Sequence, residues 1–286
     1  MSKIDLHCHT LYSDGALAPA ELLMRAHNQQ VDVLAITDHD TVDAISEIIA
    51  LQSAEKRELH IIPGVEISTA WHGFDIHILG LNVHWQDAQF TQRLAQQQST
   101  RLQRAEEMAE KLEKAGCEGI FETAQKLAGK GQITRAHFAR ALIASGKVSH
   151  FQQAFKQYLA KGKRAFVKPN WISVIEAVQW ITDAGGTAVL AHPSRYDLSA
   201  KWLRRLMLEF KEAGGEGIEV MYPGLSPSLK NQLAMYAKEY GFYGSMGSDF
   251  HAPGRWCELG RHLSMPEHVI PVWDAWSETT KMQVNA

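Results

Sequence analysis

The sequence has little cysteine and no long apolar run. Its three cysteines, Cys8, Cys117 and Cys257, lie far apart and form no C-x-x-C pair, which argues against a disulfide framework and a thiolate zinc site. No stretch approaches the roughly 18 uninterrupted apolar residues of a membrane span, and the first residues contain no apolar signal core. The sequence therefore predicts a cytoplasmic protein without a membrane segment.

Acidic residues are missing from one part of the chain. Residues 123–175 contain no Asp or Glu but carry ten Lys and Arg, whereas the whole chain has a net charge of −3. A basic segment is thus set into an otherwise acidic chain, and this contrast indicates an anionic partner. A solvated helix face balanced by acidic neighbours in space would explain the composition equally well.

The chain is long and apolar enough for one large α/β domain with or without an insertion, at 286 residues and 45% hydrophobic content. Short apolar runs predict buried strands at residues 3–7, 31–37, 59–67, 74–83, 186–192, 217–221 and 241–248. Helical patterns separate most of these runs, and this alternation predicts a parallel sheet, open or closed. Residues 87–164 contain no convincing strand, which predicts an all-helical insertion.

Histidine is abundant, with 14 residues, and six of these histidines lie with three carboxylates near the ends of expected strands. The nine residues are His7, His9, Asp14, His39, Glu66, His77, His192, Asp249 and His251. In α/β barrels the loops at these strand ends carry catalytic groups. A single buried histidine is more often a hydrogen-bonded core residue than a ligand. Nine such groups at the same strand ends would, however, be unsatisfied buried polarity unless metal ions bound them.

The ligand types and their number indicate the chemistry. Imidazole and carboxylate without thiolate suit Zn, Mn or Fe(II) rather than Ca, and nine ligands would serve two or three ions with open positions. Three divalent ions and three carboxylates together give the site a net positive charge, which attracts phosphate. The pattern predicts phosphoester hydrolysis by a metal-bound hydroxide, with Asp38 orienting a ligand histidine instead of acting as a base.

Four motifs resemble those of the polymerase and histidinol phosphatase (PHP) family: HCHT at 7–10, TDHD at 37–40, AHP at 191–193 and SDFH at 248–251. The resemblance implies a distorted seven-stranded β/α barrel, formed by residues 1–84 and 165–286, and a basic helical insertion of residues 85–164. It also implies three metal ions, usually manganese, with iron or zinc as alternatives. Their ligands would be His7, His9, Glu66 and Asp249 for one ion, Glu66, His77 and His192 for another, and Asp14, His39 and His251 for the third.

Further segments resemble a bacterial branch of this family that contains nucleotide phosphatases and exoribonucleases. They are IPGVEIST at 62–69, ITRAHFAR at 133–140, YLAKGK at 158–163, and HPSRY with LSAKWL within 192–203. The resemblance implies removal of the 3′-phosphate from nucleoside 3′,5′-bisphosphates. It also implies 5′-to-3′ trimming of short 5′-phosphorylated RNA, including ribosomal RNA precursors.

The basic insertion would then hold the phosphate that is not cleaved. Arg135 and Arg195 are the main candidates, because the guanidinium group offers a planar bidentate fork for phosphate; His137, Lys161 and Lys163 are secondary candidates. An ion pair with Asp197 is the alternative role for Arg195. Two other functions stay open: a histidinol-phosphate phosphatase or other small-molecule phosphomonoesterase, and a non-catalytic, metal-dependent RNA-binding protein. The sequence does not fix the oligomeric state.

Overall fold

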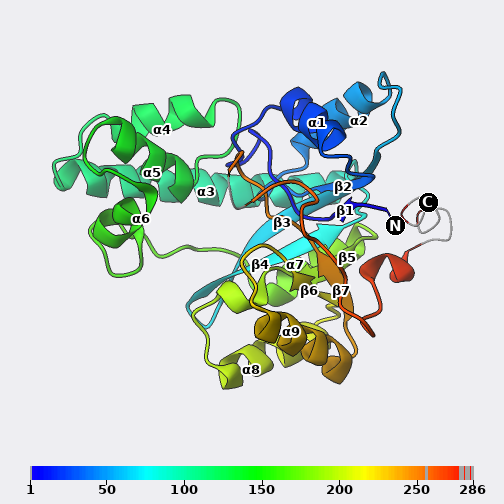
Figure 1. Ribbon diagram of the computed structural model, residues 1–286. Coiled ribbons are helices and arrows are strands. Elements are labelled where there is room, and N and C mark those ends of the chain that lie inside the picture. The colour runs from blue at the N-terminus through cyan, green and yellow to red at the C-terminus, as the bar shows by residue number, and fades with distance from the viewer. Residues whose placement is uncertain (1, 255–256, 277–279, 281–283, 285–286) are drawn as a thin grey trace.

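In the computed structural model, which describes residues 2–254, 257–276, 280 and 284, seven strands form one sheet in chain order (Figure 1). The strands are β1 (Ile4–Asp5), β2 (Val33–Ile36), β3 (His60–Trp71), β4 (Phe74–Leu81), β5 (Thr187–Leu190), β6 (Gly217–Met221) and β7 (Tyr243–Met246). Backbone bonds join the two ends of this sheet: Leu6 N donates to Met246 O at 3.0 Å, and His9 N donates to Phe250 O at 2.9 Å. The sheet is a nearly closed seven-stranded barrel, which confirms the expected fold.

The expectation of a parallel sheet is wrong for one strand, because β4 runs antiparallel to both β3 and β5. Only His72 and Gly73, both with positive φ, separate β3 from β4. A two-residue turn reverses the chain directly, without a crossover helix. The other four neighbouring pairs are parallel. The reversal pairs His77 with Ser68, so that His77 lies beside the part of β3 that carries Glu66.

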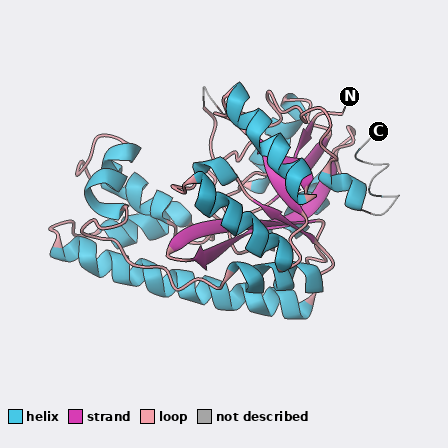
Figure 2. Cartoon of the chain, turned by 90° about the horizontal axis from the view of Figure 1, so that it is seen from below, coloured by secondary structure: helices cyan, strands magenta, loops and turns pink. Residues whose placement is uncertain are grey.

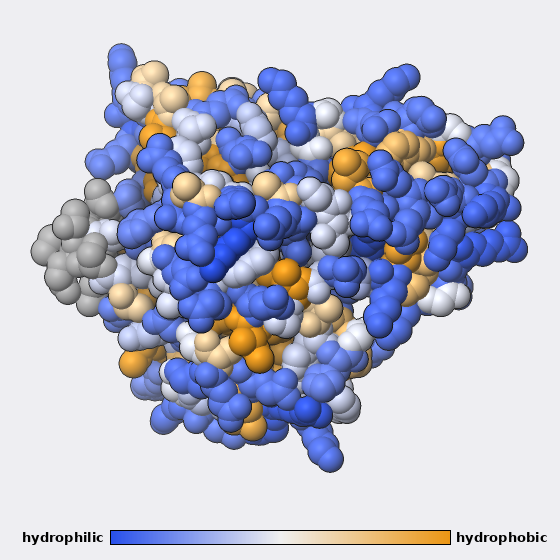
Figure 3. All heavy atoms as spheres, turned by 180° about the vertical axis from the view of Figure 1, so that it is seen from behind, coloured by the Kyte–Doolittle hydropathy of each residue, from blue (hydrophilic) through white to orange (hydrophobic). Residues whose placement is uncertain are grey.

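Helices between the strands cover the outside of the barrel: α1 (Pro19–Asn28), α2 (Asp43–Gln52), α7 (Val174–Asp183), α8 (Ala200–Glu212) and α9 (Pro227–Tyr240), with the short 3₁₀ turns η2 (Pro193–Arg195) and η3 (Val272–Ala275). Their buried faces form an apolar core with one face of the strands, and the other face of the strands forms a second apolar cluster with η3. The face seen in Figure 3 is mainly hydrophilic, with apolar patches between the charged side chains. In the part of the chain that the structure describes, no helix combines the length and apolar character needed to span a membrane.

The described chain between β4 and α7 forms only helices and loops. It contains α3 (Ala88–Lys114), α4 (Ile120–Ala128), α5 (Arg135–Ala144), α6 (Phe151–Ala154) and a π-helical turn, η1 (Phe155–Leu159). The helix α3 is much longer than the others and extends from the barrel to α4–α6, which lie to one side (Figures 1 and 2). Phe90 and Leu94 of α3 belong to the barrel core, whereas Met108 and Leu112 belong to a separate core with α4–α6. The helix α3 therefore joins two cores, and the domain limits at residues 85 and 164 stay a prediction.

Candidate metal centre and its cationic pocket

The structure brings the nine predicted ligands together at one end of the barrel, with the carboxylate of Glu66 at their centre. Five imidazole nitrogens lie within 3.3 Å of its oxygens, from His7, His9, His39, His77 and His192. Burial would raise the pKa of Glu66, but the surrounding imidazoles outweigh burial and hold this pKa well below its usual range. The imidazoles therefore favour the ionised form of this buried carboxyl.

Closure of the barrel positions three of these residues, His7, His9 and Asp249. The chain after β1, which carries His7 and His9, pairs with the chain after β7, and Asp249 N donates to His7 O at 2.8 Å. Glycine is required at position 247 because a Cβ atom there would lie 2.3 Å from the Cβ of His7. This close approach sets Asp249 Oδ1 at 3.3 Å from the Nε2 atoms of both His7 and His9.

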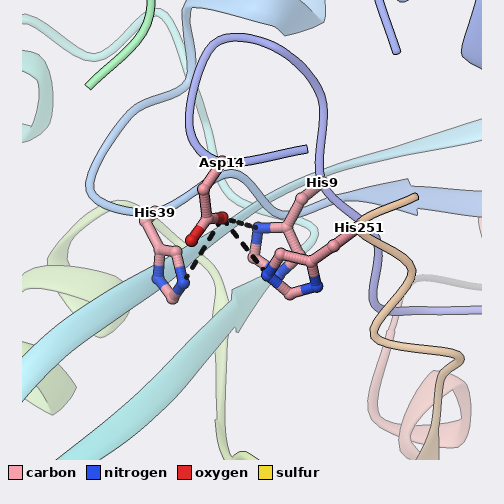
Figure 4. A group of neighbouring side chains, drawn as sticks. All are labelled: His9, Asp14, His39 and His251. Carbon is pink, nitrogen blue, oxygen red and sulfur yellow. Dashed lines mark ion pairs between the residues drawn. The ribbon is translucent and has the colours of Figure 1, made fainter. Parts of the chain in front are cut away.

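The ligand atoms form three groups, each compact enough for one metal ion. The groups are His7, His9, Glu66 and Asp249; His9, Asp14, His39 and His251; and His39, Glu66 and His77. In the second group the carboxylate of Asp14 points toward three imidazoles (Figure 4). Its Oδ1 lies 3.2 Å from His251 Nε2, 3.8 Å from His39 Nε2 and 3.9 Å from His9 Nδ1. The grouping differs from the expected one in two ways. His9 contributes to two groups, and His39 stands with Glu66 and His77 where His192 was expected. His192 belongs to none of the three groups, although its Nε2 lies 3.0 Å from Glu66 Oε1.

The donor atoms fit bound cations because two of them are buried without a hydrogen bond, although each lies at ion-pair distance from another predicted ligand. Asp14 Oδ1 and His39 Nδ1 are buried and accept or donate no hydrogen bond among the described residues. A buried polar atom left in this state costs free energy unless an ion or water satisfies it. The imidazole and carboxylate donors suit Mn, Fe(II) or Zn.

Two carboxylates behind the ligands fix their orientation. Glu219 of β6 is fully buried; its Oε1 lies 3.1 Å from His7 Nδ1, and its Oε2 accepts the backbone N–H of His192 at 2.6 Å. Asp38 accepts hydrogen bonds from the hydroxyls of Thr10 and Ser13 at 2.6 and 2.5 Å. Ser13 Oγ in turn lies 3.3 Å from His9 Nδ1, so Asp38 reaches the ligand through this hydroxyl. Such contacts orient metal ligands and select their tautomers.

A cavity of about 400 Å³ lies between this centre and the helical insertion. The centre contributes Asp14, His39, His77 and His251 to its lining; four arginines form its walls, Arg101, Arg104, Arg135 and Arg140; and Phe151, Phe155 and Trp171 add aromatic surface. The cavity lining therefore combines imidazole and carboxylate groups of the centre with guanidinium groups of the insertion.

Two of the four arginines have no carboxylate partner among the described residues. Arg101 pairs with buried Asp40, and Arg135 pairs with Asp75 at 3.2 Å. Arg140 donates only to the backbone oxygen of Asp14, at 2.9 Å. Arg104 is 8% exposed. Its Nε donates to Val167 O at 3.2 Å, whereas its buried Nη2 has no hydrogen-bond partner within the described part of the chain. Burial, together with the neighbouring arginines, lowers the pKa of Arg104 to about 10, so it stays charged at neutral pH and lacks a counter-ion.

The other predicted substrate residues lie in different surroundings. Arg195 forms an ion pair with Asp249 rather than with Asp197, and its guanidinium lies 5.2 Å from the ring centre of Tyr222. His137 is fully buried, and its Nδ1 accepts the backbone N–H of Thr134 at the start of α5. Lys161 and Lys163 are exposed and are not part of the cavity lining.

Sequence reasoning missed Arg101, Arg104, Arg140 and Glu219. The two arginines of α3 are three residues apart, on one face of a helix rich in Gln, Arg and Glu. That spacing was a usable signal, but nothing in it distinguishes a cavity wall from a solvated face. Glu219 lies within the apolar run GIEVM at 217–221, where a lone carboxylate in an expected buried strand was also a usable signal.

Comparisons with known proteins agree with this geometry. The family model described as PHP domain matches residues 5–170. The chain is 48% identical to the 5′-3′ exoribonuclease Rnm of Escherichia coli over 274 residues, which cover 96% of this chain and 94% of the relative. It is 40% identical to a 3′,5′-nucleoside bisphosphate phosphatase of Chromobacterium violaceum over 275 residues, 96% of each chain.

A solved structure is similar over almost the whole chain. It is described as an amidohydrolase from Chromobacterium violaceum with bound sulfate and no metal, and it superposes with a TM-score of 0.90 at 38% sequence identity. The alignment covers 99% of this chain and 97% of that one, so the similarity includes the barrel and the helical insertion alike.

Proposed function

The chain belongs to the PHP domain family, and from this premise we propose that it is a metal-dependent phosphoesterase that acts on nucleotides. Its substrates are short 5′-phosphorylated RNA, which it degrades as a 5′-3′ exoribonuclease, and nucleoside 3′,5′-bisphosphates, from which it removes the 3′-phosphate. Ribosomal RNA precursors are among the RNA substrates. The relatives carry names for both activities, which supports a single site with two related substrates.

The observation that carries this proposal is the continuity of the ligand cluster with the cationic cavity. A substrate with one phosphate needs only the metal centre, whereas Arg104 and Arg140 provide charge for a second phosphate in the same cavity. Guanidinium groups bind phosphate through planar, paired hydrogen bonds. A nucleotide with two phosphates would therefore fit both ends of the site.

Three divalent ions, with manganese as the expected ion, would be held by the nine ligands. We assign His7, His9, Glu66 and Asp249 to one ion, Glu66, His77 and His192 to a second, and Asp14, His39 and His251 to a third. The first set coincides with one compact ligand group of the structure, and the contact of His192 Nε2 with Glu66 Oε1 at 3.0 Å supports its place in the second. When bound, such ions supply Lewis-acid activation of the phosphoryl group and of water.

The protein groups bind and orient the substrate around this chemistry. Arg104, Arg135 and Arg140 hold the phosphate that stays on the nucleotide, while Arg195, which contacts the ligand Asp249, neutralises charge at the reacting phosphate. Glu219 and Asp38 keep the ligand imidazoles in place. No side chain acts as an isolated general base.

The test measures the products that the purified protein releases in the presence of Mn²⁺ from three substrates: adenosine 3′,5′-bisphosphate, histidinol phosphate and a 5′-phosphorylated oligoribonucleotide. We expect release of inorganic phosphate from the first, nucleoside 5′-monophosphates from the third and little turnover of the second. Preference for histidinol phosphate would replace the proposal by a small-molecule phosphatase. Binding of RNA without turnover, with all nine ligands intact, would instead support a non-catalytic RNA-binding protein.

A variant links the activity to the ligand cluster. Asp249→Ala removes the carboxylate that lies 3.3 Å from both His7 and His9, and we expect it to abolish release of products from both nucleotide substrates. The matched control is Asp183→Ala, which removes a carboxylate that pairs with Arg93 on the outside of the barrel. Full activity of the Asp249 variant would contradict the metal assignment.

A further inference from the structure

Two phenylalanines of the insertion line the same cavity as the arginines. Phe151 is the first residue of α6, and Phe155 begins the π-helical turn η1; their ring centres lie 5.2 Å apart with the planes tilted by 34°. Arg135 lies 5.9 Å from the ring centre of Phe155. An aromatic surface thus lies directly beside the cationic wall.

Packing accounts for one of these rings but not for the other. Phe155 packs against the apolar core of the insertion. Phe151 is 42% exposed, and it borders the cavity. A single exposed apolar residue is ordinary on a protein surface, but this one extends a ring surface into a charged cavity and precedes a π-helical turn, a feature frequent at functional sites. The position of Phe151 favours contact with a ligand.

The polar side chains around the cavity are engaged with protein groups. Ser68 Oγ accepts a hydrogen bond from Arg101 at 2.6 Å, Thr134 Oγ1 accepts the N–H of Ala136 at 3.1 Å, and Asp75 pairs with Arg135. Each of these three groups therefore already has a protein partner. The aromatic surface offers only a ring face, which every base can use.

We propose that Phe151 and Phe155 form a stacking platform for the nucleobase of the nucleotide whose uncleaved phosphate is held by Arg104 and Arg140. This inference rests on the proposed function and specifies it further: the site requires a base but accepts any base. Stacking on aromatic side chains is tolerant of sequence because it uses no edge contacts.

The experiment measures the effect of the base directly. Adenosine 3′,5′-bisphosphate is compared with an abasic analogue in which tetrahydrofuran replaces the nucleoside, in the wild type, in Phe151→Ala and in the control Leu127→Ala. Leu127 is 39% exposed on α4 of the same insertion and does not line the cavity. A second readout is calorimetric binding of adenosine 5′-monophosphate and its abasic analogue without added metal, which does not depend on turnover.

We expect Phe151→Ala to lower kcat/KM and affinity for the adenosine compounds by roughly 5- to 150-fold, the range for loss of one base–aromatic stack. Values for the abasic analogues should not change, and Leu127→Ala should match the wild type on all compounds. The milder variant Phe155→Leu, which retains apolar packing, should show a smaller loss of the same kind.

Three outcomes separate the hypotheses. If the wild type treats base-bearing and abasic compounds alike, or if Phe151→Ala affects both equally, the platform is refuted. Differences of more than about tenfold among the four nucleoside 3′,5′-bisphosphates would refute base-independent binding. If the wild type releases no phosphate from any nucleotide while binding of adenosine 5′-monophosphate still depends on Phe151, the proposed function fails and the platform stands.

Discussion

Replacing Arg101 by alanine should lower the free energy of unfolding by several kcal/mol, because Arg101 links the helical insertion to the loop that carries His39. Arg101 lies in the middle of α3, and its Nε donates to Asp40 Oδ2 at 3.1 Å while its Nη2 donates to Ser68 Oγ at 2.6 Å. The guanidinium also lies 4.9 Å from the ring centre of Trp171. Asp40 follows the ligand His39 directly and adopts φ 53°, a left-handed conformation that is unusual for a residue other than glycine. The pair therefore holds a strained loop that carries a metal ligand.

The magnitude follows from burial. The side chain of Arg101 is 8% exposed and that of Asp40 is 0% exposed, so Arg101→Ala leaves a buried carboxylate whose remaining hydrogen bond comes from Ser68 N. Removing one partner of a buried ion pair costs about 3–5 kcal/mol, a large fraction of the roughly 5–15 kcal/mol of an ordinary domain. The double variant Arg101→Met with Asp40→Asn should lose less than Arg101→Ala alone, because no buried charge remains.

The assay is urea unfolding followed by circular dichroism, with the affinity for Mn²⁺ measured in parallel because His39 depends on the same loop. The control is Arg93→Ala on the same helix, which removes a partly exposed ion pair with Asp183 and should cost no more than about 1 kcal/mol. The reasoning is refuted if Arg101→Ala costs as little as Arg93→Ala. It is also refuted if the double variant is less stable than Arg101→Ala.

Three further predictions concern other buried groups. Arg104→Met keeps the aliphatic packing but removes the cation that has no carboxylate partner among the described residues. We expect KM for adenosine 3′,5′-bisphosphate to rise roughly tenfold or more with little change in kcat. The control Arg93→Met should leave KM unchanged, and an equally unchanged KM in Arg104→Met would exclude Arg104 from substrate binding. Glu219→Gln should lower metal affinity about 10- to 100-fold, measured by metal titration, because Glu219 orients His7 and His192; unaltered affinity would show that Glu219 is dispensable. Burial lowers the pKa of His137 to about 4. Between pH 6.5 and about 4, His137 is therefore protonated in the unfolded chain but neutral in the folded protein. Stability should fall by roughly 3 kcal/mol as pH decreases from 6.5 to about 4, and His137→Gln should weaken this dependence in urea unfolding at several pH values.

The ligand cluster could be predicted because its signal is local. His7 and His9 are two residues apart in extended chain, as are Asp249 and His251, and such spacing directs side chains to one side. Both pairs follow expected strands, and strand ends converge at one rim of a barrel. Barrel closure then brings the two pairs together through the backbone bonds between residues 6–9 and 246–250.

The direction of β4 was not predicted. Alternation of strands and helices indicates parallel strands, but no helix lies between β3 and β4, so the pattern does not apply to this pair. The expected strand at 59–67 ended too early, whereas β3 continues to Trp71 and meets β4 through a two-residue turn. The sequence His72–Gly73 between two apolar runs was the available signal. Its consequence is specific: His77 reaches Glu66, at 2.9 Å, from an antiparallel neighbour instead of from a strand end.

The cationic wall shows why the charge of a segment does not identify the residues that bind. Residues 123–175 are free of acid, yet only Arg135 and Arg140 of that segment are among the arginines of the cavity, while Lys161 and Lys163 lie outside it. Arg101 and Arg104 come from the part of α3 that precedes the segment and contains Glu106 and Glu107 nearby. Net charge sets the long-range attraction of an anion, but the proposed phosphate site relies on Arg104 and Arg140, which have no carboxylate partner among the described residues. The burial of Arg104 depends on where α3 passes between the barrel core and the core of the insertion. This placement results from packing, and the amino-acid composition of neither part predicts it.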